Sequence, residues 1–217
     1  MTWRATTQRR PTHLLLHNGA GTEEQVLKTL PNNPVLRMTT SQAALKLNNN
    51  EITETGFGTS QAGWLRAPEG TQKTVIENWC NQVMADCEWF VDIRLPIWQK
   101  LAINCVINPL TAIHNIKNGV LSQPQFQMDI KVLLKEFFTV SEAEQIPLDK
   151  DKITQQVKTV INKTAENYSS MHQDVAMGRK TEIDFINGYL LSCAAKRNIP
   201  LPLNQKLVSA ISNLHLK

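Results

Sequence analysis

The sequence predicts an α/β unit followed by an all-α unit, and two observations carry this prediction. As far as about Asp92, short apolar runs alternate with turn residues, which is typical of strands joined by loops. Beyond Leu95, apolar residues recur at helical spacing over long stretches. We therefore expect a first domain over residues 1–92 and a helical second domain over residues 93–217.

The first half is expected to hold short strands and two helices. Strand-like runs lie at Thr12–His17, Val35–Leu47, Glu51–Phe57, Ser60–Arg66 and Cys87–Asp92. A short helix is predicted over Glu23–Leu30, because Pro31 cannot continue it. A second helix is predicted over Thr71–Ala85, with Val75, Ile76, Trp79 and Val83 on one side. The tract Asn48–Asn50 predicts a turn.

The second half is expected to be a set of helices. Helical spacing is found over Gln125–Val140, Asp149–Glu166, Thr181–Lys196 and Leu203–Leu214. A longer apolar stretch, Leu95–Asn118, contains Pro109, which lacks the backbone N–H that a helix needs. We expect this proline to kink or interrupt the helix.

Composition and charge exclude several classes of protein. With 41% hydrophobic and 19% charged residues, the chain is neither a disordered tail nor a fibrous repeat. The net charge of +4 is small and scattered, so we expect no nucleic-acid partner. The sequence contains no apolar run of the roughly 20 residues that span a bilayer, so no membrane partner is expected. The basic stretch Met1–Arg10 lacks the apolar core of a secretory signal.

The four cysteines favour a reduced protein. Cys80, Cys87, Cys105 and Cys193 form no Cys-x-x-Cys pair, and none has a histidine at metal-ligand spacing. We interpret them as thiols that act as small core hydrophobes in a cytoplasmic protein, and we expect no metal.

The sharpest candidate for chemistry is a polar stripe within the long apolar stretch. Lys100, Asn104 and Asn108 are spaced i, i+4 and i+8, so they share one side of a helix. A buried asparagine is costly unless its amide is hydrogen-bonded. Two asparagines in line with a lysine therefore indicate a polar ligand. A solvated seam, or asparagines capping a broken helix, would give the same spacing.

Three other segments carry polar residues of interest. Glu166–Asp174 is a polar cluster, and Lys180–Gly188 is another, in which Thr181 could cap the following helix. Glu182 would then lie in the first helical turn, where a carboxylate is favoured even without a function. His17–Gly21 follows a strand, and ligands of open α/β sheets bind beyond such strand ends. An ordinary strand-to-helix turn would look the same.

Taken together, four segments resemble the ketopantoate reductase (2-dehydropantoate 2-reductase) family, over about Pro11 to His215. They are Leu16–Gly19, Lys100–Thr111, Ser169–Asp174 and Thr181–Gly188. The resemblance implies a Rossmann-type domain, of which residues 1–92 would be the C-terminal part. It also implies an all-α domain like the C-terminal domain of 6-phosphogluconate dehydrogenase. The active site would lie in the cleft between them.

The resemblance also implies an activity and a set of site residues. The activity is NADP(H)-dependent reduction of 2-dehydropantoate to (R)-pantoate in pantothenate biosynthesis. The partner would be a small keto acid, and a homodimer is compatible with it. Carried over residue by residue, the catalytic positions are Lys100 and Glu182, the substrate-binding positions are Asn104, Asn108, Asn118 and Ser170, and the cofactor-side positions are Asn18 and Asn167.

The sequence also departs from the family pattern. Family members begin with a strand and a GxGxxG-type turn that holds the pyrophosphate, and this chain contains no such turn. We therefore expect a chain truncated at its N-terminus, with an exposed sheet edge and impaired activity. Two alternatives remain open: a related hydroxy-acid dehydrogenase, and a non-catalytic remnant that serves as a helical interaction module.

Overall fold

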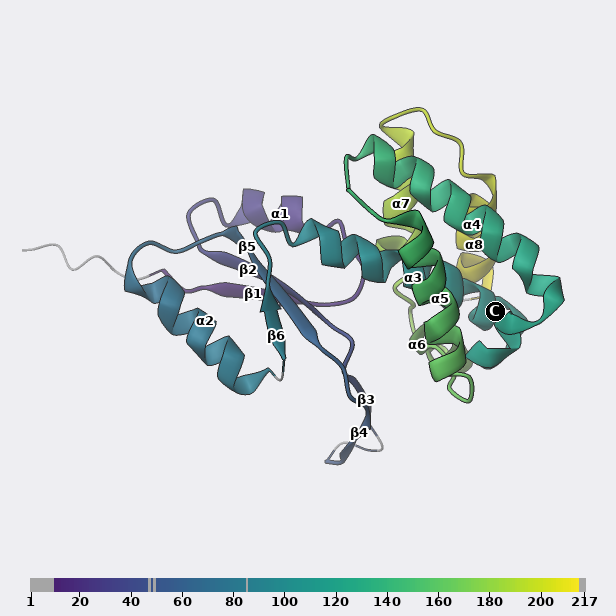
Figure 1. Ribbon diagram of the computed structural model, residues 1–217, viewed down its shortest axis with the longest axis horizontal. Helices are drawn as coiled ribbons and strands as arrows, with labels where there is room; N and C mark the ends of the chain where they lie inside the picture. The colour runs from purple at the N-terminus through teal and green to yellow at the C-terminus, as the bar shows by residue number, and fades with distance from the viewer. Residues whose placement is uncertain (1–9, 47, 49, 85, 215–217) are drawn as a thin grey trace, which may run out of the picture. The chain divides into compact units, whose positions relative to one another are not determined.

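The computed structural model describes residues 10–46, 48, 50–84 and 86–214. They form two compact units (Figure 1). The first comprises the described residues of 1–17 and 22–93, and the second comprises residues 18–21 and the described residues of 94–217. This division falls one residue beyond the expected boundary and assigns Asn18–Gly21 to the helical unit. Residues 1–9 of the predicted basic stretch, Asn49 of the predicted turn and Ala85 of the predicted helix lie outside the described residues.

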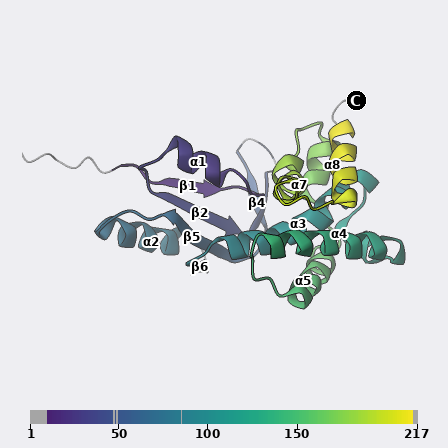
Figure 2. The ribbon, with the colours of Figure 1, turned by 90° about the horizontal axis from the view of Figure 1, so that it is seen from above.

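The first unit is built on a four-stranded mixed sheet with the order β1-β2-β5-β6 (Figure 2). The strands are β1 (His13–Leu16), β2 (Val35–Thr40), β5 (Ser60–Arg66) and β6 (Cys87–Trp89). β1 and β2 are parallel, β2 and β5 are antiparallel, and β5 and β6 are parallel. Each parallel pair is connected through a helix, α1 (Glu23–Thr29) or α2 (Thr71–Val83), as parallel strands require.

The predicted run Val35–Leu47 is divided into two strands. β3 (Ala43–Lys46) pairs antiparallel with β4 (Ile52–Gly56) in a separate two-stranded sheet, which Figure 1 shows projecting from the main sheet. The chain turns at Ser41, whose backbone N–H donates to the Thr59 carbonyl at 3.0 Å. Gly58 permits this close approach, because a Cβ there would lie 2.4 Å from the Ser41 carbonyl carbon.

A buried arginine holds the carboxyl end of β1. Arg37 of β2 is 1% exposed, and its Nε donates to the Glu23 carboxylate at 2.8 Å. Its Nη1 donates to the Leu15 and His17 carbonyls, both at 3.2 Å. These bonds compensate the buried charge, and they tie the end of β1 to the start of α1.

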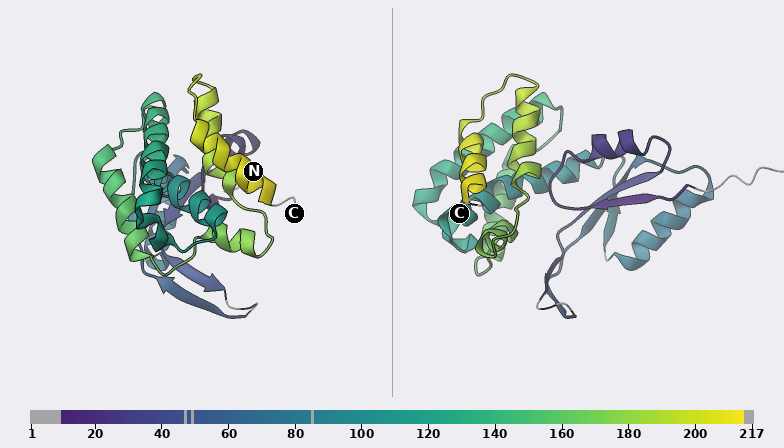
Figure 3. Two further views of the ribbon diagram at one scale, coloured as in Figure 1. Left: turned by 90° about the vertical axis from the view of Figure 1, so that its right-hand side faces the viewer. Right: turned by 180° about the vertical axis from the view of Figure 1, so that it is seen from behind.

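The second unit is helical (Figure 3). Its elements are α3 (Arg94–His114), η1 (Asn118–Ser122), α4 (Pro124–Ala143), α5 (Lys150–Lys163), α6 (Ser170–Ala176), η2 (Ile183–Phe185), α7 (Asn187–Ala195) and α8 (Pro202–Leu214). Helix α3 is the centre of this unit, because α4, α5, α6 and α8 all pack against it. The core includes Leu101, Leu110, Phe137, Val157 and Ile211. Among the described residues, no helix is long and apolar enough to cross a membrane.

Three sequence predictions for this unit need correction. Of the expectation that Pro109 kinks or interrupts the helix, the interruption is wrong: α3 continues through it, and a side chain of α7 satisfies the carbonyl that the proline leaves open. The predicted helix Thr181–Lys196 is divided into η2 and α7, because Ile186 leaves helical geometry with φ −106° and ψ −93°. Helix α6 lies within a segment that the polar pattern had marked only as a cluster.

Candidate functional site

The predicted polar stripe lies on α3. Lys100 and Asn104 are half-buried, and Asn108 is only 7% exposed. The neighbouring residues of the helix, such as Leu101 and Cys105, are buried in the core. Within the described chain, the side-chain amides of Asn104 and Asn108 form no hydrogen bond. Two half-buried or buried amides without protein partners are suited to binding a polar ligand.

The structure brings Lys100 together with Asn18, two residues that lie far apart in the sequence. The Lys100 ammonium donates to Asn18 Oδ1 at 2.8 Å. Asn18 begins a four-residue segment, Asn18–Gly21, that belongs to the helical unit. This bond joins the first residue of the Asn18–Gly21 segment to the lysine of the polar stripe.

The glycines of this segment allow it to pack closely on the helical unit. Gly19 (φ +75°) and Gly21 (φ +100°) adopt conformations that favour glycine. A Cβ at Gly19 would lie 2.4 Å from the Phe185 carbonyl oxygen, and one at Gly21 would lie 2.7 Å from the Tyr189 ring. Between them, the Ala20 N–H donates to the Phe185 carbonyl at 2.9 Å. These glycines therefore serve packing and do not leave an open phosphate cradle.

Glu182 lies immediately before η2 and is half-buried. Its carbonyl accepts a hydrogen bond from the Phe185 N–H at 2.9 Å. The expectation that Thr181 caps a helix whose first turn holds Glu182 is wrong, because the regular helix begins only at Asn187. Glu182 is thereby placed on the short turn that also holds the Asn18–Gly21 segment.

Ser170 is exposed at the first position of α6, while its neighbour Ser169 is buried. The hydroxyls of Ser169 and Thr111 are hydrogen-bonded at 2.7 Å, which attaches the start of α6 to α3. Ser169 Oγ also accepts the His172 N–H at 3.1 Å and so caps α6. Sequence reasoning missed this buried pair, although a serine directly before a helix is a common N-cap.

His172 forms a second link between α6 and the end of α3. Its Nε2 lies 2.7 Å from Asn115 Oδ1, so Nε2 carries the proton and donates it. The Tyr168 ring stacks on the imidazole at a centroid distance of 4.3 Å. Burial lowers the pKa of His172, because the charged form loses its hydration. The neutral imidazole therefore forms a fixed link between α6 and the end of α3.

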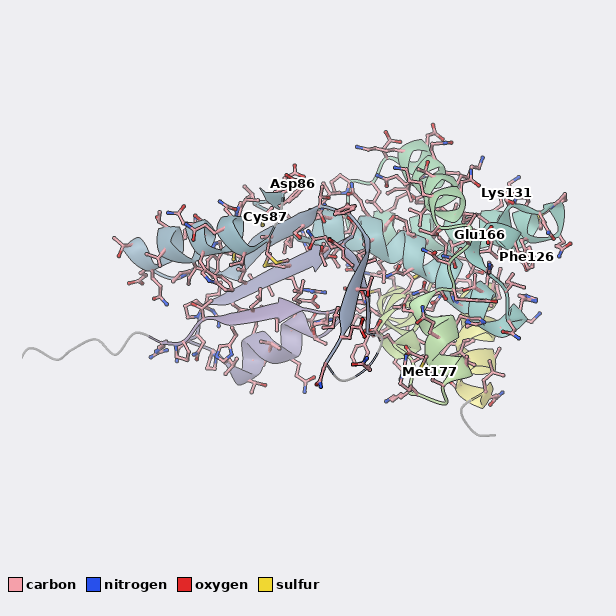
Figure 4. All side chains as sticks on the ribbon, turned by 90° about the horizontal axis from the view of Figure 1, so that it is seen from below. Asp86, Cys87, Phe126, Lys131, Glu166 and Met177 are labelled. Atoms are coloured by element: carbon pink, nitrogen blue, oxygen red, sulfur yellow. The ribbon has the colours of Figure 1, made fainter. Side chains whose placement is uncertain are left out.

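Asn118 and Asn167, predicted separately, are joined through the backbone. The Asn118 N–H donates to the Asn167 carbonyl at 2.9 Å, and the Asn118 side-chain amide donates to Thr164 Oγ1 at 2.9 Å. Asn118 Oδ1 is buried without a donor among the described residues, whereas the side chain of Asn167 is exposed. Beside them, Lys117 pairs with Glu166 at 2.8 Å (Glu166 is labelled in Figure 4), which lowers the carboxyl pKa and raises the lysine pKa.

The four cysteines take no part in this arrangement as nucleophiles. All are thiols and not disulfides, and Cys105, on the same helix as Lys100, is fully enclosed. Burial raises the pKa of the Cys105 thiol well above its ordinary value, so it stays protonated and unreactive.

The fold and these side chains define a class: a mixed-sheet α/β unit followed by a helical domain whose central helix carries a lysine–asparagine stripe. The sequence profile "Ketopantoate reductase PanE/ApbA C terminal" matches residues 92–215. A 2-dehydropantoate 2-reductase of Vibrio cholerae is 41% identical over 201 residues, covering 93% of this chain and 68% of the relative. The chain belongs to the ketopantoate reductase family.

Solved structures show the same fold. D-mandelate dehydrogenase in its ternary structure with NADH and anilino(oxo)acetate matches with a TM-score of 0.83 and 22% identity, over 93% of this chain and 67% of that one. A dimeric ketopantoate reductase from Staphylococcus aureus matches with a TM-score of 0.79 and 19% identity, over 94% and 68%. The chain spans 63 to 68% of the length of the curated relatives that it matches.

Proposed function

We propose that this chain carries the keto-acid site of a 2-dehydropantoate 2-reductase, which reduces 2-dehydropantoate to (R)-pantoate in pantothenate biosynthesis. The observation that carries the proposal is the Lys100 ammonium, held 2.8 Å from Asn18 beside two asparagine amides without protein partners. The curated relative from Vibrio cholerae, of that name, supports the choice of substrate.

Lys100 is assigned the role of proton donor. Reduction of a ketone places negative charge on the carbonyl oxygen. An ammonium next to that oxygen stabilises the charge and then donates its proton, which yields the hydroxyl. The bond to Asn18 Oδ1, at 2.8 Å, holds the ammonium of Lys100 in place. Glu182 would orient the ammonium and the substrate.

The asparagines and Ser170 are assigned to substrate binding. Asn104 and Asn108 can bond the hydroxyl of the substrate and so fix which face of the ketone is reduced. Ser170 would hold the substrate carboxylate, since it is exposed at the start of α6 and the Ser169–Thr111 bond fixes its position. Asn118 contributes a buried oxygen that still needs a donor.

Among the described residues, those that fit the cofactor would meet its nicotinamide end. A bound nicotinamide supplies the hydride. Asn18 would lie beside it, with Asn167 as a further contact, and NADP(H) is the form that we propose. The chain's glycines at 19 and 21 are occupied by packing against Phe185 and Tyr189, so they offer no site for the pyrophosphate. We therefore propose that this chain, taken alone, has impaired activity. We also propose a cytoplasmic location, because the four cysteines are free thiols and the cytoplasm keeps thiols reduced.

Two other functions have specific support. The fold likeness to D-mandelate dehydrogenase, bound to NADH in its structure, supports a reductase of another 2-keto acid. The ketopantoate reductase of Staphylococcus aureus is dimeric, which supports a helical unit that pairs with a second copy. A homodimer is also compatible with the proposed reductase.

The test is a chimera in which the glycine-rich segment of the Vibrio cholerae relative is joined in front of Pro11. Oxidation of NADPH and NADH is measured with 2-dehydropantoate and with phenylglyoxylate, the keto acid of mandelate. We expect NADPH oxidation with 2-dehydropantoate. A preference for phenylglyoxylate would assign the chain to the other reductases. A folded chimera that reduces neither keto acid would favour the third hypothesis, a helical interaction module. Size-exclusion chromatography of the chain alone would then show whether it pairs with a second copy.

A further inference from the structure

Pro109 creates an unusual demand within α3. In a regular helix, the backbone N–H at position 109 would donate to the carbonyl of Cys105, but proline has no N–H. That carbonyl lies in the buried core, where an unpaired acceptor is costly. The side-chain amide of Asn187, the first residue of α7, donates to it at 3.0 Å. A side chain from another helix therefore takes the place of the missing backbone donor.

The orientation of the Asn187 amide is set by a buried network. Its Nδ2 also donates to Asn204 Oδ1 at 2.8 Å, and Asn204 Nδ2 donates to the Glu136 carboxylate at 2.7 Å. Glu136 further accepts the N–H groups of Leu203 and Asn204 at the start of α8. Both acceptors of Asn187 Nδ2 need a donor, so the amide cannot be reversed. Its Oδ1 is buried without a donor among the described residues, so the two N–H bonds are what this side chain contributes.

Three hydrogen bonds then close a ring that contains the proposed catalytic lysine. On α3, Lys100 donates to Asn18. Two residues further along that segment, Ala20 donates to the carbonyl of Phe185. Two residues beyond Phe185, Asn187 donates to Cys105, which is on α3 again and five residues from Lys100. The ring thus runs from α3 through Asn18–Gly21 and the η2–α7 junction and back to α3.

We infer that Asn187 is a positioning residue that holds the η2–α7 junction on α3, and thereby holds Asn18 against Lys100. The inference deepens the proposed function, because it takes Lys100 and Asn18 to be site residues. Helix α7 could be held by apolar packing alone, since Leu190 and Cys193 are buried. Packing lacks direction, whereas a hydrogen bond to one carbonyl fixes the register of the two helices.

The test uses amide hydrogen exchange of the unchanged chain and its variants. It distinguishes a role of Asn187 in positioning the Asn18–Gly21 segment from a role in the stability of the helical unit. The variants are Asn187→Ala, Pro109→Ala and the double variant, with Ser141→Ala as control. Ser141 is buried on α4 and donates to the Phe138 carbonyl, so its variant loses a buried bond outside the ring. The Ala20 amide reports the ring, and the amide of Phe137, deep in α4, reports the stability of the unit.

Asn187→Ala should make the Ala20 amide exchange at least about tenfold faster, which is the scale of one lost buried hydrogen bond. Pro109→Ala restores a backbone donor to Cys105. The double variant still lacks the bond to Asn204. Its loss of Phe137 protection relative to Pro109→Ala should therefore be smaller than the loss that Asn187→Ala causes in the unchanged chain, while Ala20 stays fast. Ser141→Ala should not change Ala20 more than Phe137. If Ala20 protection follows Phe137 in every variant, Asn187 is only a stabilising residue and the inference is overturned.

Two further results keep the test decisive. If Asn187→Ala alone does not fold, the comparison of Pro109→Ala with the double variant gives the same answer. If the chimera described above reduces no keto acid while Ala20 still responds to Asn187, the proposed function has failed and the ring remains a packing device. The exchange readout needs neither substrate nor cofactor, so the two failures are distinguishable.

Discussion

The helical unit and the sheet unit differ in how completely they bury their apolar residues. Helix α3 is packed by neighbours along most of its length, and its unit has a large continuous core. The core of the sheet unit is small, and apolar residues remain exposed on β1 and α2: Leu14, Leu16, Val75, Trp79 and Val83. Exposed apolar faces of this kind mark surfaces that bind another segment or partner. The helical unit thus encloses a much larger apolar core than the sheet unit does.

The largest expected effect concerns what the sheet unit lacks. Without a glycine-rich phosphate-binding turn, the chain should bind NADPH weakly or not at all. Micromolar affinity needs about 8 kcal/mol of binding free energy, which is hard to assemble without the pyrophosphate site. Calorimetric titration of the chain with NADPH measures this, with the chimera as the positive control. Micromolar binding by the chain alone would show that the sheet unit is complete for this ligand.

The second prediction compares the two cores. Phe137→Ala removes a fully buried ring of the helical unit, which contacts Trp98 at a centroid distance of 5.6 Å. It should lower the free energy of unfolding by about 3–5 kcal/mol. Trp79→Ala, at a side chain that is 53% exposed on α2, should change it by less than about 1 kcal/mol. Denaturant unfolding of both variants decides the matter, and similar losses would contradict the contrast drawn between the units.

The third prediction concerns the site on α3, measured in the chimera. Lys100→Ala should reduce kcat at least ~10²-fold, or about 2.7 kcal/mol, because the proton donor and its charge are both lost. Asn104→Ala and Asn108→Ala should act more on KM, since they bind groups present in ground and transition states alike. Glu182→Ala should change both parameters. Near-normal turnover of a folded Lys100→Ala variant would remove this lysine from the mechanism.

The smallest expected effect is a pH dependence in the helical unit. The pKa of His172 is lowered in the folded protein by burial, so the unfolded chain takes up a proton first as the pH falls. Its contribution to stability is therefore complete above about pH 6.5 and is lost as the pH falls toward the folded pKa. Thermal unfolding between pH 7.5 and about pH 5 should show a shallower loss for His172→Gln than for the unchanged chain. Parallel curves would mean that His172 titrates normally.

Much of the local structure could be predicted because it depends on neighbouring residues. The spacing of Lys100, Asn104 and Asn108 placed them on one helical side, and the order of apolar runs placed β1, α1, α2 and α8 within a few residues. Predictions failed where a distant partner overrides the local preference. Pro109 was expected to kink or interrupt the helix, yet α3 continues through it, and Asn187 supplies the missing donor. Thr181 looked like a cap, but the helix that it would cap starts later, at Asn187.

The order of residues was sufficient for the α/β-then-helical plan, the lysine–asparagine stripe and the family, because periodicity and motifs are properties of short segments. It could not show that Lys100 meets Asn18, that Ser169 rather than Ser170 is the buried hydroxyl, or that Asn187 completes α3. Each of these is a hydrogen bond between residues far apart along the chain. Such bonds form only when packing brings a donor within about 3 Å of an acceptor, and no local pattern encodes that distance.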